Sequence, residues 1–200
     1  MRLGILGGTF DPVHVGHLAL AEASRTAFDL DRVLFVPTFM PPHKPEGAVA
    51  SADDRLAMVR RAVEAAPHFA VSEVELERQG PSYTVDTLAE LQRRHPGAEL
   101  YFVAGADQVM ALHTWRDPQR LVQLARVIAV TRPGYDLTRL EEQERRLGPA
   151  AQGRFLPLAW LELGLSSTDL RRLLAEGRSV RYLVPDRVLE YIEERRLYRD

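Results

Sequence analysis

Short apolar runs alternate with longer amphipathic segments over most of the chain. Runs at residues 3–6, 33–36, 69–74, 100–104 and 127–130 are rich in β-branched or aromatic side chains and are bounded by turn residues, which predicts strands. Apolar side chains at helical spacing predict helices over residues 16–28, 53–66, 83–94 and 118–125. The strands are apolar almost throughout, as is typical of strands buried on both faces. The alternation therefore predicts an α/β fold, a Rossmann-like and mainly parallel sheet with helices on both faces.

The rest of the chain extends this pattern without a second domain boundary. Residues 38–51 contain three prolines and are predicted to form a loop longer than most connections, a kind that is usually functional or disordered. A charged helix over residues 136–148, a further strand within residues 155–163 and helices over residues 168–176 and 185–195 follow. The chain shows no internal repeat, and 200 residues are ample for one buried core. We therefore expect a single domain over residues 1–200.

Composition narrows the class of partner. The formal net charge is -2 and the sequence pI is about 6.3, which argues against a nucleic acid or an anionic membrane as partner and favours small molecules. The chain has no cysteine, so a disulfide framework and a thiolate metal site are excluded. We expect no secretory signal, because the first residues lead directly into a predicted strand, and no apolar run approaches the roughly 18 residues of a membrane span. A cytoplasmic location is expected, while the oligomeric state, a homo-oligomer included, is left open.

The first candidate site is the junction between the strand at residues 3–6 and the helix that follows it. Its turn reads G-G-T-F-D-P-V-H-V-G-H over residues 7–17. Glycines let the backbone approach a phosphate, and a new helix directs its unpaired N–H groups and positive dipole end to the same place. His14 and His17 are three residues apart and can face the same side of the first turn, while Gly16 between them can relieve crowding where the helix begins. We expect Asp11 to organise this turn rather than to act as a base.

The stretch S-S-T-D-L-R at residues 166–171 predicts a second phosphate site. Ser166 or Ser167 is a natural N-cap, and Arg171 lies one turn further over the same helix end. Taken alone, an ordinary capped helix with a solvated arginine explains this stretch better; the first site in the same chain reverses that preference. Lys44 is the only lysine among 26 basic residues and sits in the proline-rich loop, where its compact ammonium suits a mobile phosphate. Local charge balance at a helix start is an adequate account of Asp54-Arg55.

Five segments of the chain resemble a known family. The stretch G-T-F-D-P-V-H-V-G-H at residues 8–17 resembles the signature of the nucleotidyltransferase superfamily that shares its H-x-G-H element with class I aminoacyl-tRNA synthetases. The other four segments are similar to those of bacterial nicotinate-mononucleotide adenylyltransferases: P-P-H-K at residues 41–44, S-Y-T-V-D-T-L at residues 82–88, G-A-D at residues 105–107 with Trp115, and L-S-S-T-D-L-R at residues 165–171. On this resemblance the single expected domain is a nucleotidyltransferase domain.

The resemblance implies transfer of the adenylyl group of ATP to nicotinate mononucleotide, giving nicotinate adenine dinucleotide and pyrophosphate in NAD biosynthesis. It implies catalytic roles for His14, His17, Lys44 and Arg171. It implies ATP binding by His14, His17 and Arg171 and also by Gly8, Thr9, Phe10, Gly105, Asp107, Ser166, Ser167 and Thr168. It implies binding of nicotinate mononucleotide by Thr9, Lys44, Tyr83, Thr84, Trp115 and Arg132. Trp115 would stack on the pyridine ring, and the helix start at Tyr83-Thr84 would receive its carboxylate.

The chemistry expected of these groups is direct displacement at phosphorus. The mononucleotide 5′-phosphate would attack the α-phosphorus in line, with no covalent intermediate, and it is already an anion, so it needs no general base. Mg²⁺ would bridge phosphate oxygens of ATP, and the sequence identifies no protein ligands for it. His17 would lie nearest the charge that develops at the α-phosphoryl group.

Alternative functions remain open at this point. A nicotinamide-mononucleotide adenylyltransferase is the nearest rival, and a pantetheine-phosphate adenylyltransferase or a cytidylyltransferase shares the first motif. From a different class, the chain could be a non-catalytic module that senses a nucleotide. Lys44, the two histidines and Arg171 argue against that interpretation, because simple binding needs fewer charges directed at one triphosphate. A tRNA synthetase fragment is disfavoured by the acidic charge balance.

Overall fold

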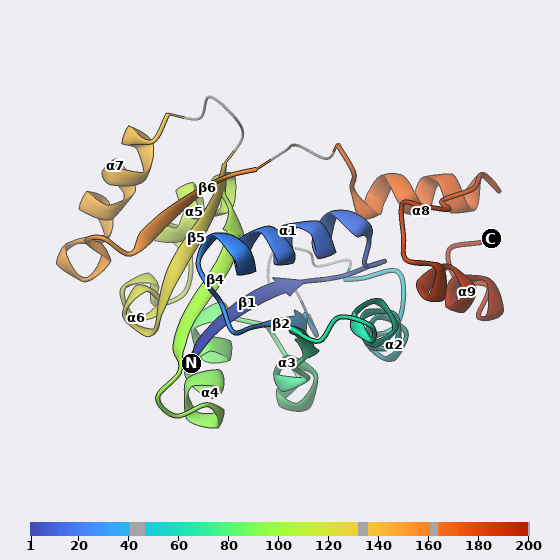
Figure 1. Cartoon of the computed structure of the whole chain (residues 1–200), viewed down its shortest axis with the longest axis horizontal. Coiled ribbons are helices and arrows are strands. Elements are labelled where there is room, and N and C mark those ends of the chain that lie inside the picture. Colours follow the sequence, from blue (N-terminus) through green and yellow to red (C-terminus); the bar gives the residue numbers. More distant parts are fainter. Residues whose placement is uncertain (41–46, 132–135, 161–163, 200) are drawn as a thin grey trace. The chain divides into compact units, whose positions relative to one another are not determined.

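Six strands form a single sheet in the order β3-β2-β1-β4-β5-β6, as seen in a computed structural model of the chain (Figure 1). The structure describes residues 1–40, 47–131, 136–160 and 164–199. The pairs β1–β4, β4–β5 and β5–β6 are parallel, with Leu3 opposite Leu100 and Phe102 opposite Val127. This strand order is that of the Rossmann fold. The predicted α/β class is therefore confirmed.

The apolar runs become the strands because their side chains are buried on both faces. Leu3 and Ile5 of β1 and Val127 and Ile128 of β5 are all within 1% of complete burial. Such consecutive burial requires continuous apolar sequence, which is the pattern that predicts the strands. The strands are β1 (Arg2–Gly8), β2 (Arg32–Pro37), β3 (Phe69–Val71), β4 (Glu99–Gly105), β5 (Ala125–Thr131) and β6 (Phe155–Ala159).

The long helices confirm the amphipathic pattern. They are α1 (Val15–Ala27), α2 (Ala52–Val63), α4 (Thr84–Arg94), α6 (Pro118–Leu124), α7 (Thr138–Leu147), α8 (Ser167–Ala175) and α9 (Asp186–Glu194). None of the helices in the described part of the chain is long and apolar enough to cross a membrane.

Short elements depart from the expected pattern. The strand predicted over residues 69–74 ends at Val71, and a one-turn helix, α3 (Val74–Arg78), begins within the predicted range. Helix α5 (Ala106–Ala111) is not expected from the sequence; the Gln108 side chain accepts the N–H of Gly105 and so caps its start. The 3₁₀ turns η1 (Leu112–Thr114) and η2 (Pro149–Ala151) are not expected either. Each is too short to show a period in sequence.

The described chain divides into two compact units. The first comprises residues 1–6, 23–33 and 83–162. Within it β4, β5 and β6 lie side by side, α5 packs against β4 and β5, and α6 packs against β5 (Figure 1). Gln143 of α7 is buried and donates to Val109 O of α5, which holds these two helices together.

The second unit comprises residues 7–22, 34–82 and 163–200. Its core contains Phe35, whose ring lies 5.8 Å from that of Phe10 and 5.4 Å from that of Phe69. Helix α2 packs against β3 and α9. The unit thus brings the turn after β1 together with the C-terminal helices, the two regions in which the sequence predicts phosphate binding. The prediction of one domain over residues 1–200 stays a prediction.

Candidate active site

The two predicted phosphate-binding motifs line the same pocket in the second unit. This pocket has a volume of about 830 Å³. Its walls come from the turn after β1, from residues 47–49 and from the start of α8. The lining residues are Thr9, Phe10, Asp11, His14, His17, Gly47, Ala48, Val49, Leu165, Ser166, Ser167, Thr168 and Arg171. A pocket of this size is in the range that holds a nucleotide.

His14 and His17 lie face to face at the start of α1. Their ring centroids are 3.7 Å apart, and the edge of the Phe10 ring meets His17 at 5.0 Å. The backbone N–H of His14 donates to Nδ1 of His17 at 3.2 Å. Because Nδ1 accepts this bond, the proton of the neutral His17 ring sits on Nε2. The expectation that both histidines share one face of the first turn is confirmed, and His17 is left with a defined donor.

Both imidazoles are neutral in the free protein near pH 7. Burial lowers the pKa of His14 from 6.5 to about 4. Burial also lowers the pKa of His17 to about 3, with a further contribution from the adjacent His14. Nδ1 of His14 is buried and has no hydrogen-bond partner among the described residues. The two rings therefore offer neutral N–H donors rather than positive charges. A bound anion raises the pKa of a neighbouring imidazole and so favours its protonation.

Gly16 and Gly8 allow two close approaches in this turn. A Cβ atom on Gly16 would lie 3.0 Å from Nδ1 and 3.1 Å from Cε1 of His14. A Cβ atom on Gly8 would lie 3.0 Å from the ring of Phe10. The predicted role of Gly16, relief of crowding beside the histidines, is thus borne out by the geometry. Gly8 has the same role for Phe10, whose backbone is itself in the left-handed region with φ of 51°.

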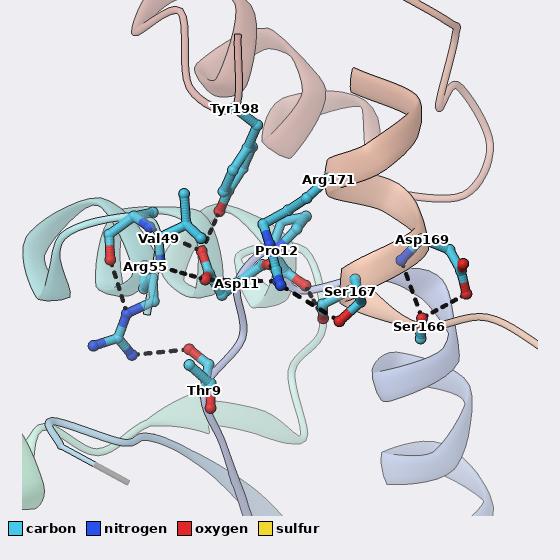
Figure 2. A network of polar contacts seen from close by, with 12 residues as sticks. Thr9, Asp11, Pro12, Val49, Arg55, Ser166, Ser167, Asp169, Arg171 and Tyr198 are labelled. Carbon is cyan, nitrogen blue, oxygen red and sulfur yellow. Dashed lines mark hydrogen bonds and ion pairs between the residues drawn. The ribbon is translucent and has the colours of Figure 1, made fainter. Parts of the chain in front are cut away.

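The start of α8 is joined to the first motif by two hydrogen bonds (Figure 2). Ser167 Oγ donates to Pro12 O at 2.9 Å, and Arg171 Nη1 donates to Asp11 O at 2.7 Å. Ser166 is the N-cap, since its Oγ accepts the N–H of Asp169 at 3.1 Å. Arg171 is the one arginine or lysine among the described pocket residues. The second motif therefore supplies a helix start and a cation to the pocket that the first motif opens.

The buried side chains of Asp11 and Arg55 bind backbone groups of the segments around this site. Asp11 is 3% exposed and accepts the N–H groups of Val49 at 2.8 Å and Ala50 at 3.1 Å, so its carboxylate joins the turn to residues 49–50, and its role as organiser of the turn itself stays a prediction. Arg55 is 1% exposed, and its guanidinium donates to Thr9 O at 2.8 Å, to Ala50 O at 3.3 Å and to the carbonyl groups of Thr38 and Phe39 (Figure 2). Burial lowers the pKa of Arg55, and the Asp11 carboxylate opposes this shift.

The sequence interpretation of Arg55 as local charge balance is wrong, because its hydrogen-bond partners are backbone carbonyls, three of them 16 or more positions away in the chain. One signal for burial is present in the sequence: Arg55 lies four residues before Val59 and eight before Val63, on the buried face of α2. Tyr198, whose hydroxyl donates to Asp11 at 2.7 Å, is missed altogether by sequence reasoning. No local pattern identifies it, since the two residues are 187 positions apart.

Of the six residues expected to bind the acceptor, Tyr83, Thr84, Trp115 and Arg132 belong to the first unit, and Thr9 and Lys44 belong to the second. Tyr83 is the N-cap of α4, so the expected helix start at Tyr83-Thr84 is confirmed. The Arg116 guanidinium lies 4.7 Å above the Tyr83 ring and 3.4 Å from Asp86. Trp115 is half-buried and meets the Phe102 ring edge-on at 6.1 Å.

Four predicted site residues remain: Gly105, Asp107 and Arg132 in the first unit and Lys44 in the second. Gly105 ends β4 and Asp107 is exposed in the first turn of α5. Lys44 and Arg132 lie outside the described residues, so their predicted roles stay predictions. No group of three or more histidine, aspartate or glutamate side chains in the described ranges could hold a metal ion.

Comparison with known proteins gives one consistent family. A family model described as cytidylyltransferase-like matches residues 5–173. A probable nicotinate-nucleotide adenylyltransferase of Thermus thermophilus is 49% identical over 199 residues, which cover 100% of both chains. A probable nicotinate-nucleotide adenylyltransferase of Desulfitobacterium hafniense is 46% identical over 202 residues, covering 99% of this chain and 96% of the relative.

Solved structures share the fold. The nicotinic acid mononucleotide adenylyltransferase of Plasmodium falciparum complexed with APC superposes with a TM-score of 0.78 at 17% identity, covering 98% of this chain and 96% of the other. The same protein complexed with NaAD gives a TM-score of 0.77 at 18% identity, with coverage of 98% and 97%. At this level of identity the likeness supports the Rossmann-like architecture alone.

Proposed function

Because the chain belongs to the cytidylyltransferase-like family and, within it, to the nicotinate-nucleotide adenylyltransferases, we propose that it transfers the adenylyl group of ATP to nicotinate mononucleotide. The products are nicotinate adenine dinucleotide and pyrophosphate, in a step of NAD biosynthesis. The observation that carries the proposal is the pocket whose walls are the first motif and the start of α8. Two helix starts that line one pocket, with a cation between them, suit a polyphosphate.

The reaction is an in-line displacement at phosphorus. A 5′-phosphate oxygen of nicotinate mononucleotide forms a bond to the α-phosphorus of ATP, and the bond from that phosphorus to the α,β-bridging oxygen breaks. Pyrophosphate leaves with that electron pair. The attacking oxygen is already anionic, so no side chain has to remove a proton. The protein contributes by positioning the two phosphates and by stabilising the charge that develops between them.

His17 is the donor that we assign to the α-phosphoryl group. Its Nδ1 is occupied by the His14 N–H, so its Nε2–H is the group free to donate. The rings of Phe10 and His14 both pack against the His17 ring. Negative charge that develops on phosphate oxygens raises the pKa of a neighbouring imidazole. Both rings therefore become stronger hydrogen-bond donors in the transition state. We assign His14, Thr9, Phe10 and Gly8 to the same phosphates.

The start of α8 is assigned to the distal phosphates. Ser166, Ser167 and Thr168 lie in its first turn and Arg171 projects into the pocket from the next turn. We also assign Lys44 to the transition state, as the family resemblance implies. The charge balance of the described pocket supports a further cation, because the Arg171 charge is opposed by the adjacent Asp11 carboxylate at 3.7 Å.

The acceptor is assigned to four residues of the first unit and also to Thr9 and Lys44. Tyr83 and Thr84 at the start of α4 are proposed to receive the carboxylate of the nicotinate, and Trp115 to stack on its ring. Arg132 is proposed to contact the mononucleotide phosphate, and Gly105 and Asp107 the nucleotide at the end of β4. A single nucleotidyltransferase domain and a cytoplasmic location complete the proposal.

Mg²⁺ enters this scheme with ATP, as part of the substrate. The described residues offer no cluster of carboxylates or imidazoles that would retain the ion alone. Mg²⁺ keeps several waters and binds through substrate phosphates, so a pocket of N–H and cationic groups around a triphosphate fits this arrangement. Its contribution is to neutralise charge on the phosphate oxygens.

The test is pyrophosphate release from ATP and Mg²⁺ with one acceptor at a time: nicotinate mononucleotide, nicotinamide mononucleotide or pantetheine phosphate. We expect release with nicotinate mononucleotide. Release with only one of the other acceptors would overturn the substrate assignment, and ATP binding without release in any arm would favour a nucleotide-sensing module. Two variants of His17 test its role. His17→Asn keeps an acceptor near Nδ1 and loses the distal donor, whereas His17→Gln keeps a donor near Nε2.

We expect His17→Asn to lower kcat by about 10²–10³-fold, as for the loss of one donor to a transition-state oxyanion. His17→Gln should retain clearly more activity. Circular dichroism and thermal unfolding check that both variants fold. Equal activity of the two variants would contradict the assignment of the distal nitrogen.

A further inference from the structure

Tyr198 lies in the segment after α9 and reaches the base of the phosphate pocket. Its hydroxyl donates to Oδ1 of Asp11 at 2.7 Å (Figure 2). Asp11 is 3% exposed and lines the pocket. Burial raises the pKa of Tyr198 above its usual value, and the Asp11 carboxylate raises it further, so the hydroxyl keeps its proton. The segment after α9 thus supplies one of the donors to a carboxylate within the proposed site.

The same carboxylate holds two walls of the pocket. Oδ2 accepts the N–H of Val49 at 2.8 Å, and Oδ1 accepts the N–H of Ala50 at 3.1 Å, beside the Tyr198 hydroxyl. Arg171 Nη1 donates to the backbone oxygen of Asp11 at 2.7 Å and forms a longer ion pair with Asp11 Oδ2 at 3.7 Å. Arg171 therefore touches Asp11 without forming the two-bond pair that an arginine and a carboxylate prefer.

The backbone after α9 is strained in a way that places the Tyr198 hydroxyl. Arg196 and Tyr198 have φ of 53° and 63°, in the left-handed region that favours glycine, and neither is glycine. The N–H of Leu197 bonds back to Ile192 O, so the chain turns sharply after α9. Backbone strain at Arg196 and Tyr198 indicates that the position of the Tyr198 side chain has a function.

We propose that Tyr198 is a positioning residue for the triphosphate: its hydroxyl holds the Asp11 carboxylate on the N–H groups of residues 49 and 50. The carboxylate is thereby kept from a closer, two-bond pair with Arg171, whose guanidinium stays available to phosphate. Without the hydroxyl, Oδ1 loses its shortest bond, and the carboxylate can turn to pair with Arg171. That pairing would draw the guanidinium away from the nucleotide. The inference rests on the proposed function only in taking ATP as the ligand.

Tyr198→Phe is compared with Tyr191→Phe, a matched control. The Tyr191 hydroxyl also donates to a carboxylate near the start of a helix, Asp54 Oδ1 at 2.8 Å, and Asp54 does not line the pocket. Both variants lose one hydroxyl bonded to a carboxylate, so a merely structural role predicts similar losses of stability. The readout is the Kd of ATP with Mg²⁺ by calorimetry, together with the KM of each substrate.

We expect Tyr198→Phe to weaken ATP binding about tenfold, the size of one charge-assisted hydrogen bond. Tyr191→Phe should leave ATP affinity within about twofold of the wild type, and the KM of nicotinate mononucleotide should not change in either. In an Arg171→Ala background the Tyr198→Phe step should have no further effect on the Kd of ATP, because the residue through which Tyr198 acts is gone.

Two outcomes overturn the inference: equal ATP affinity in the two tyrosine variants, or the same tenfold step with and without Arg171. The binding measurement needs no acceptor. A wild type that binds ATP and releases no pyrophosphate with nicotinate mononucleotide would therefore overturn the proposed function alone. An active wild type whose Tyr198→Phe and Tyr191→Phe variants bind ATP equally would overturn the positioning role alone.

Discussion

Acid should destabilise this protein through His14, and a variant that lacks the His14 imidazole tests the effect. Burial holds the pKa of His14 at about 4, against 6.5 for an unperturbed histidine. Between these values the unfolded chain binds a proton that the folded chain does not bind. The free energy of unfolding contributed by His14 is therefore unaffected above pH 6.5 and falls as the pH drops toward 4.

The magnitude follows from the two pKa values. One pKa unit corresponds to about 1.4 kcal/mol, so the largest loss is about 3 kcal/mol below pH 4, and the loss at pH 5 is about 2 kcal/mol. The assay is urea unfolding of the wild type and of His14→Asn at pH 8 and at pH 5. Carboxylates titrate in both proteins and cancel in the comparison. The stability difference between the two proteins should shift by about 2 kcal/mol in favour of His14→Asn on going to pH 5.

An exposed histidine provides the control. His68 is exposed beside a proline, and His68→Asn should track the wild type at both pH values. A difference between wild type and His14→Asn that stays constant from pH 8 to pH 5 would refute the reasoning, because it would mean that His14 takes up its proton as readily in the folded protein as in the unfolded chain.

Three further predictions concern the parts that support the pocket. Arg55→Met should lower the free energy of unfolding by about 3–5 kcal/mol, because several backbone carbonyls lose a buried, charged donor. Arg60→Met, on the exposed side of the same helix, should lower it by less than about 1 kcal/mol. Similar urea midpoints for the two variants would contradict this prediction. Gly16→Ala should reduce kcat on the order of 10²-fold with little change in melting temperature, because its Cβ displaces the His14 ring; an unchanged kcat would contradict this role of Gly16. Excess EDTA should stop pyrophosphate release and added Mg²⁺ restore it; unchanged turnover in EDTA would remove the metal from the scheme.

The part of the fold that can be predicted from sequence is the part whose side chains repeat. Leu3 to Leu6 and Val127 to Val130 are continuous apolar runs because both faces of their strands are covered, and this pattern is unmistakable. Helix α5 has only six residues, and what starts it is a single bond from the Gly105 N–H to the Gln108 side chain. A bond of that kind leaves no period in the sequence.

The candidate site likewise has residues that the sequence predicts and residues that it does not. His14, Gly16 and His17 lie close together in the chain, so their spacing and the role of the glycine can be inferred from the sequence alone. The partners of Arg55 are backbone oxygens, which carry no residue identity, and nothing in their sequence could reveal them. Tyr198 acts on a partner 187 positions away. Long-range contacts of this kind require the fold itself.

The bonds from Ser167 to Pro12 and from Arg171 to Asp11 join segments more than 150 residues apart, and they have a consequence during synthesis and turnover of the protein. A nascent chain cannot complete the pocket until α8 has emerged from the ribosome, so partly made chains should not bind nucleotide. In the finished protein, ATP that bridges both motifs should hold the C-terminal segment against local opening. At 100 times its Kd, such a ligand suppresses opening by about 2.7 kcal/mol, so nucleotide should protect the C-terminal helices from proteases.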